Sequence, residues 1–171
     1  MHSLNAPVPA VIAERRDDLV DQLSTFERHR EHLTLVVKRF GERSPGALVH
    51  LEHQLEDILT RWGPIEARIT GVDAFVDPPG GPAPVVYFAV DSPGLTSLHM
   101  ELVDRFGMAD PTIEGDRYVP HITLARGGSR VGLSEVTGHP IEPIDWVIDE
   151  LVLWTARYDR PITHLQLPTS R

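Results

Sequence analysis

The sequence Tyr-Val-Pro-His-Ile-Thr-Leu-Ala-Arg, residues 118–126, has the alternation of polar and apolar side chains that is typical of a half-buried β-strand. His121 and Thr123 would lie on one face of this strand, and the apolar residues between and after them on the other. A near copy, His-Leu-Thr-Leu, occurs earlier in the chain at 32–35. Random placement of the 9 His, 11 Thr and 18 Leu would give about 0.06 matches to His-x-Thr-Leu. The two matches therefore indicate two related strands, each presenting a His and a Thr to one surface.

The similarity between the two regions extends beyond these four residues. An arginine stands four residues before each histidine, at Arg28 and Arg117, and a helix-like segment precedes each motif, at 18–23 and at 101–106. An apolar segment near a proline comes before each of these helices. Each half reads as strand, helix and His-x-Thr strand, at a spacing too long for a solenoid. We predict an α+β fold with two similar lobes around a pseudo-twofold axis, with antiparallel sheets lining a central cleft and helices outside.

Local signals predict the remaining elements. Ser followed by Pro at 44–45 and at 92–93 is a typical helix start, with the serine as cap and the proline in the first turn. The apolar run 85–90 predicts a central buried strand. We also expect an edge strand at 3–9, a first helix at 10–26, the first motif strand at 32–40 and a surface loop at 127–143.

The composition is that of an ordinary globular protein. The 171 residues suffice for one compact domain, 1–171, and the absence of cysteine excludes disulfides and cysteine-based zinc sites. We find no signal-peptide pattern and no apolar run that could span a bilayer, so we expect a cytoplasmic protein with no membrane partner, and a monomer. The net charge of −9 argues against a broad basic surface for nucleic acid, but it allows a small basic pocket for one phosphate.

Two imidazoles that face each other across a cleft suit the cleavage of a phosphate ester without a metal ion. One neutral His can accept a proton from water or an alcohol, and the other, when protonated, can donate one to the leaving oxygen. The hydroxyl groups of Thr34 and Thr123 share the faces of His32 and His121 and can donate hydrogen bonds to phosphate oxygens. A positively charged side chain is needed to stabilise the negative charge that develops on those oxygens. Strict alternation places Lys38 on the face of His32, although a lysine at a strand end can also extend into solvent.

Paired His-x-Thr-Leu strands in a chain of this length resemble the 2H phosphoesterase superfamily, and in particular the RNA 2',3'-cyclic phosphodiesterases once named 2'-5' RNA ligases. The resemblance implies an enzyme without cofactor or metal that opens the 2',3'-cyclic phosphate of RNA 3' ends or of small cyclic nucleotides; some relatives join or cleave 2'-5' linkages. It implies that His32 and His121 are catalytic and that Arg126 contacts the phosphate. By alternation Arg126 would point away from His121, so this role requires a twist or bulge at Gly127-Gly128. The first motif departs from the family pattern, because it is longer than usual before its end at Phe40-Gly41.

Two other classes of protein remain open from the sequence. A non-catalytic module could use the same cleft to hold a nucleotide or an RNA end, although the presence of both histidines and both threonines disfavours it. A zinc hydrolase would need a ligand cluster, and the sequence contains no His-Glu-x-x-His motif. His50 and His53 have a metal-binding spacing, but the acidic residues around them favour exposed, uncommitted histidines.

Overall fold

The computed structural model describes residues 1–169. Its strands are β1 (His2–Ala6), β2 (Arg28–His29), β3 (Leu35–Gly41), β4 (Ile65–Phe75), β5 (Val85–Asp91), β6 (His121–Arg126), β7 (Ile144–Ile148), β8 (Glu150–Thr155) and β9 (Arg160–Gln166). Its helices are α1 (Ala10–Asp17), α2 (Val20–Leu23), α3 (Pro45–Leu59), α4 (Pro93–Phe106), α5 (Arg130–Thr137) and the short 3-10 helix η1 (Gly115–Arg117).

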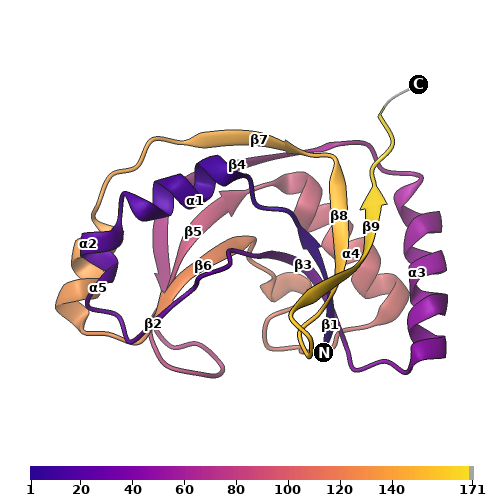
Figure 1. Cartoon of the computed structure of the whole chain (residues 1–171), viewed down its shortest axis with the longest axis horizontal. Helices are drawn as coiled ribbons and strands as arrows, with labels where there is room; N and C mark the ends of the chain where they lie inside the picture. The colour runs from indigo at the N-terminus through magenta and orange to yellow at the C-terminus, as the bar shows by residue number, and fades with distance from the viewer. Residues whose placement is uncertain (170–171) are drawn as a thin grey trace.

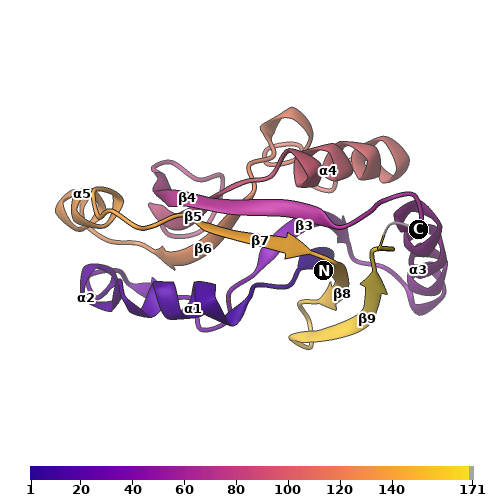
Figure 2. The same ribbon diagram turned by 90° about the horizontal axis from the view of Figure 1, so that it is seen from above.

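The nine strands in residues 1–169 form one sheet, in which every pair of neighbours is antiparallel. The order from edge to edge is β7-β4-β5-β6-β3-β1-β8-β9, and β2 pairs with β6. The sheet curls into a half-barrel with the helices arranged around it (Figure 1). Seen from above, α4 lies on one side of the sheet, and α1 and α2 lie on the other (Figure 2).

The predicted duplication is visible in this strand order. The two motif strands, β3 and β6, are neighbours at the centre, and β1 and β5, the first strands of the two predicted units, flank them. The predicted α+β class and pseudo-twofold layout are confirmed, with one continuous sheet in place of two. β5 is a central strand between β4 and β6, as the apolar run 85–90 predicts.

Both predicted helix starts are also confirmed. The hydroxyl oxygens of Ser44 and Ser92 accept hydrogen bonds from the backbone N–H groups three residues later, each at 3.3 Å, and a proline occupies the first helical position in both cases. Apolar side chains of α4, including Leu95, Leu98 and Leu102, are fully buried in the core. α4 packs on β3 and β4, and so supports the sheet from the side opposite α1 and α2.

Among the local predictions, those for the first strand, the first helix and the 127–143 loop are wrong. The predicted edge strand is interior, because β1 pairs with both β3 and β8 and its prolines fall after the strand ends. The predicted helix 10–26 is divided into α1 and α2 by a turn at Asp18-Leu19. The predicted loop 127–143 contains α5, which Ser129 caps by accepting a hydrogen bond from the backbone of Gly132.

No helix within residues 1–169 combines the length and the apolar character that crossing a membrane requires.

Candidate active site

His121 begins β6 and lies in an aromatic corner of the sheet. Its ring packs edge-on against Phe75 and Tyr87, with centroid separations of 5.1 and 5.2 Å. Its Nδ1 donates a hydrogen bond to the carbonyl oxygen of Val119 at 2.7 Å. A neutral ring therefore carries its proton on Nδ1 and has a lone pair on Nε2, the atom a general base uses.

The surroundings of His121 favour this neutral form. Burial has the largest effect on the pKa of His121 and lowers it below the ordinary value, because removal from water disfavours the charged form of the ring. The positive charges of Arg39 and Arg126 lower the pKa further, while the hydrogen bond to Val119 acts in the opposite direction.

Arg126 lies on the same face of the sheet as His121 because β6 contains a β-bulge. Two adjacent residues of β5 stand opposite Thr123 and Ala125, which leaves Leu124 without a partner. The extra residue reverses the alternation of side chains, so that Ala125 is buried and Arg126 lines the cleft. The bulge required for Arg126 is present, but at Leu124 and not at Gly127-Gly128.

A second bulge turns Arg39, and not Lys38, toward the cleft. Two adjacent residues of β1 stand opposite Val36 and Lys38, which leaves Val37 without a partner. Lys38 is consequently 1% exposed in the core, and Arg39 lines the cleft with His121. The predicted place of Lys38 in the cleft is wrong for this reason. The extra length of the first motif was the signal for Arg39, because a bulge accommodates one additional residue.

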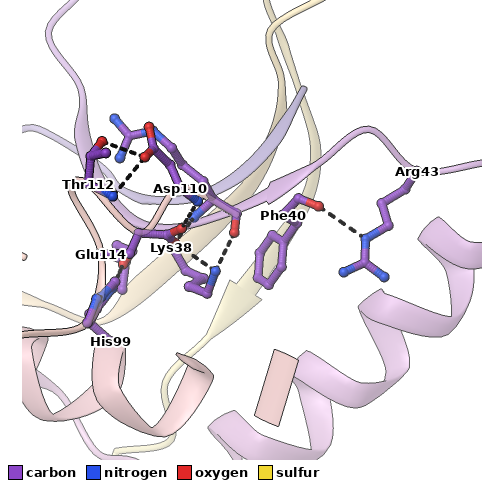
Figure 3. A network of polar contacts seen from close by, with 10 residues as sticks. Lys38, Phe40, Arg43, His99, Asp110, Thr112 and Glu114 are labelled. Atoms are coloured by element: carbon purple, nitrogen blue, oxygen red, sulfur yellow. Dashed lines mark hydrogen bonds and ion pairs between the residues drawn. The ribbon is translucent and has the colours of Figure 1, made fainter. Parts of the chain in front are cut away.

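Lys38 instead forms a buried ion pair with Glu114 (Figure 3). Its Nζ lies 2.7 Å from Oε1 of Glu114, and both side chains are 1% exposed. The other carboxylate oxygen of Glu114 accepts a hydrogen bond from the backbone N–H of Asp110 at 2.7 Å. Burial alone would raise the pKa of Glu114, but the hydrogen bonds from Lys38 and Asp110 outweigh burial and lower it. The pair fixes the segment that leads into β6 against β3.

His99 and Tyr118 hold the backbone of the β3 bulge. Nδ1 of His99 donates to the carbonyl oxygen of Val37 at 2.7 Å, and its Nε2 accepts from the backbone N–H of Gly115 at 2.9 Å. The hydroxyl of Tyr118 donates to the carbonyl oxygen of Val36 at 2.9 Å, and its ring stacks on His99 at 3.9 Å. Side chains from the second half of the chain therefore satisfy the polar groups of the bulge in the first half. No sequence spacing distinguished His99 from an ordinary helical histidine.

The first motif does not begin as a regular strand. β2 ends at His29 and β3 begins at Leu35, yet the residues of β6 that pair with them are only three apart. Six residues on one side match three on the other. In residues 30–34, here called the 30–34 segment, Arg30 still donates its backbone N–H to the carbonyl oxygen of Leu124 at 2.9 Å, and the residues after it are looped out. His32 is exposed in this segment and Thr34 is half-buried. The predicted start of the strand at His32 is wrong, because these extra residues displace it from the sheet.

The predicted site residues do not share one cavity, because His32 and His121 line different cavities and Thr123 lines neither of them. One, of about 600 Å³, is lined by His32 and Thr34 and extends to Asn5. The other, of about 560 Å³, is lined by His121 and Arg126 and, from β3, by Val36 and Arg39. Val36 pairs with Asn5 across the β3–β1 ladder, so both cavities lie on the same face of the sheet. Thr123 is half-buried on β6, two residues after His121.

His50 and His53 are exposed on α3 and line neither of these two cavities. His164 does line the cavity of His32, where its Nδ1 lies 2.8 Å from a carboxylate oxygen of Glu150. Within residues 1–169, no group of three or more His, Asp or Glu side chains is arranged to hold a metal ion.

The family model described as the 2'-5' RNA ligase superfamily matches residues 5–160. The chain therefore belongs to this superfamily, a group of 2H phosphoesterases. No curated protein matches it significantly.

Solved structures share the fold over nearly the whole chain. The crystal structure of TT0787 from Thermus thermophilus matches with a TM-score of 0.70 at 17% identity, covering 99% of both chains. The Escherichia coli protein LigT, crystallised in complex with 3'-AMP, matches with a TM-score of 0.63 at 18% identity, covering 97% of both chains. A further crystal structure described as a phosphoesterase has a TM-score of 0.57 at 21% identity, covering 99% of this chain and 98% of the other.

Proposed function

We propose that the protein is a metal-independent phosphodiesterase that opens 2',3'-cyclic phosphates at RNA 3' ends or on small nucleotides. The observation that carries this proposal is the ring of His121, whose Nε2 is available as a base in a cavity that Arg39 and Arg126 also line. Neither arginine forms an ion pair within residues 1–169, although Asp77 and Asp110 also line this cavity. The LigT complex with 3'-AMP, a ribonucleotide with a phosphate on its ribose, supports the choice of substrate.

In the proposed reaction, His121 is the general base and His32 the general acid. Nε2 of His121 takes a proton from water as the water oxygen forms a bond to phosphorus. The bond from phosphorus to one ribose oxygen breaks, and His32 gives that oxygen a proton, so the phosphate stays on the other ribose oxygen. Arg39 and Arg126 stabilise the charge that develops on the non-bridging oxygens.

Thr34 and Thr123 are assigned hydrogen bonds to the phosphate. Both are half-buried next to their histidines, and a threonine hydroxyl can donate to an anionic oxygen. The assignment of His121 as base follows from its lowered pKa and from the Nδ1 hydrogen bond, which together favour a neutral ring with an available Nε2. Because an acid must be protonated, the complementary role goes to His32.

The experiment is a hydrolysis assay on adenosine 2',3'-cyclic phosphate with the wild type, His121→Ala and His32→Ala, with the position of the product phosphate determined by ³¹P NMR. His53→Ala, which removes an exposed histidine from α3, is the control. We expect turnover in the wild type and the control, in EDTA as well as in buffer, and a severe loss in both site variants. Equal rates in all four proteins would contradict the mechanism, and activity lost in EDTA and restored by zinc would contradict metal independence.

A binding module that holds a nucleotide or RNA end without turnover is the second candidate. The observation that favours it is the displacement of His32 into the 30–34 segment, away from the regular strand. This candidate predicts binding of 3'-AMP with no hydrolysis of any cyclic or 2'-5'-linked substrate.

A further inference from the structure

A third cavity, of about 480 Å³, adjoins the cleft of His121 and is basic. Its charged lining consists of Arg28, Arg30 and Arg126, and its other residues are His29 and the turn 80–82, so no carboxylate lines it. It shares Arg126 and Gly80 with the cleft of His121, which makes the two cavities neighbours. We call this cavity the basic pocket.

The arginines of the basic pocket lie close together although their positive charges repel one another. Arg28 pairs directly opposite Arg126 across β2 and β6, and like charges in such positions destabilise a sheet. The positive charges of Arg30, Arg28 and Arg39, after the larger effect of burial, lower the pKa of Arg126. None of these four residues forms an ion pair within residues 1–169. In a chain of net charge −9, such an unpaired cluster indicates an anionic ligand.

Hydrogen bonds position Arg126 and the backbone of Arg30. Nη1 of Arg126 donates to the carbonyl oxygen of Gly80 at 2.9 Å, and a Cβ on Gly81 would lie 2.8 Å from that same nitrogen. Gly81 has φ +76°, a conformation that favours glycine, so the turn is shaped to admit the guanidinium. On the other side, Nη1 of Arg16 in α1 donates to the carbonyl oxygens of Arg30 and Glu31 at 2.9 and 3.1 Å, which holds the backbone of Arg30.

We propose that the basic pocket is a second phosphate subsite, and that the substrate is therefore an oligonucleotide rather than a single nucleoside cyclic phosphate. This inference rests on the proposed function. A 2',3'-cyclic phosphate can stand only at a 3' end, so the rest of an RNA chain continues from the 5' oxygen of the terminal nucleoside. The next phosphate along the chain lies on that oxygen, and guanidinium groups bind phosphate with paired, charge-assisted hydrogen bonds. Arg28 and Arg30 bind this second phosphate, while Arg126 stands between it and the reacting one.

The test compares kcat/KM for adenosine 2',3'-cyclic phosphate, for its 5'-phosphorylated form and for the dinucleotide ApA with the same cyclic end. The protein variant is Arg28→Gln/Arg30→Gln. The matched control is Arg61→Gln/Arg105→Gln, which removes the same charge from exposed positions that line a different cavity. We expect the wild type to prefer the dinucleotide by about 10- to 100-fold, the range for hydrogen bonds to a charged group. The Arg28→Gln/Arg30→Gln variant should reduce this preference to near unity with little change on the mononucleoside, and the control should retain it.

Three outcomes would overturn the proposal. The wild type could show no preference for the dinucleotide over the mononucleoside, or the variant could lose kcat/KM equally on the mononucleoside and the dinucleotide. The third outcome is a wild type that prefers the 5'-phosphorylated mononucleoside alone. Equal gains for the dinucleotide and the 5'-phosphorylated form support a subsite for any phosphate on that oxygen. Because the variant removes the positive charge of Arg28 that faces Arg126, together with that of Arg30, it should unfold at the same temperature as the wild type or higher, which would show that folding is intact.

Binding separates this inference from the proposed function. If no cyclic substrate is turned over, the proposed function fails, and the dissociation constants of 3'-AMP and of ApA 3'-phosphate still decide the inference. Tighter binding of the dinucleotide, lost in Arg28→Gln/Arg30→Gln but not in the control, supports a second phosphate subsite. Equal binding of the two ligands contradicts it.

Discussion

The two His-x-Thr-Leu motifs have the same residues at three of four positions, but only the second is built into the sheet. In the second, His121 and Thr123 belong to β6, which pairs with β5 on one side and with β2 and β3 on the other. In the first, His32 and Thr34 precede β3 in the 30–34 segment. A motif that specifies chemistry therefore does not by itself specify a strand, because ladder partners and chain length decide where the strand begins.

The largest expected effect tests whether the looped-out motif is as necessary as the one in the sheet. We expect His32→Ala and His121→Ala each to lower kcat by about 10²- to 10⁴-fold, the usual contribution of a general acid or base. The double variant should be little worse than the poorer single variant, since both groups act on one transition state. Steady-state kinetics on a cyclic phosphate measure this. Undiminished turnover in His32→Ala alone would show that the first motif takes no part in the chemistry.

The next effect concerns the ion pair that joins the strand of the first motif to the segment before the second. Glu114→Ala should lower the free energy of unfolding by about 3–5 kcal/mol, because it leaves the ammonium of Lys38 buried without a partner. Lys38→Met combined with Glu114→Leu should be less harmful than Glu114→Ala, since neither charge remains. Denaturant unfolding measures both.

Asp145→Ala is the control for this ion pair. Asp145 lies 3.5 Å from Arg68 with both side chains at least half exposed, and such a pair contributes at most about 1 kcal/mol. A loss in Glu114→Ala no greater than in this control would mean that the buried pair does not hold the two motifs together.

A smaller effect compares the two threonines. Thr34→Val and Thr123→Val keep the shape of the side chain and remove the hydroxyl, so each should cost about 1–3 kcal/mol in kcat/KM, the usual loss for a missing hydrogen bond to a charged oxygen. Similar losses at both sites would show that the 30–34 segment delivers its hydroxyl to the same phosphate. No loss in Thr34→Val, with the expected loss in Thr123→Val, would restrict the phosphate contacts to β6.

The smallest effect is a shift in the pH dependence of the rate. If His121 is the base, activity rises with pH through its pKa, which lies below the ordinary 6.5 or so of histidine. It falls again where the acid loses its proton, giving a bell-shaped profile. Arg39→Gln removes a positive charge that lowers the pKa of His121, so it should move the acidic limb to higher pH. An acidic limb that stays in place would assign the base to another group.

Much of the fold follows from the sequence because its signals are local. Ser44 and Ser92 cap helices with their own hydroxyl groups, and the run 85–90 is apolar because side chains on both faces of β5 are buried. The second motif was also well predicted, since β6 contains all of its residues. The predicted roles of the histidines, threonines and Arg126 remain predictions that the kinetic experiments test.

The errors arise where strand partners decide the outcome. Because Val37 has no partner in β1, Lys38 points into the core and Arg39 points to the cleft, the reverse of strict alternation. The sequence of β3 alone does not show how its residues pair with β1. The buried role of Lys38 depends on Glu114, which is 76 residues away in sequence. The basic pocket depends likewise on the pairing of Arg28 with Arg126, although the sequence had marked Arg28 by its position four residues before His32.

The junction between β3 and β6 consists of a single residue pair, Leu35 with Ile122, whereas neighbouring junctions have at least four. The two lobes are thus joined at their centre chiefly by buried side chains, and few backbone hydrogen bonds oppose a change in the angle between them. The Lys38–Glu114 ion pair and the hydrogen bond from Tyr118 to the carbonyl oxygen of Val36 are polar contacts that tie β3 to the segment before β6. The relative position of the two motifs therefore depends on a small number of side chains rather than on a long backbone ladder.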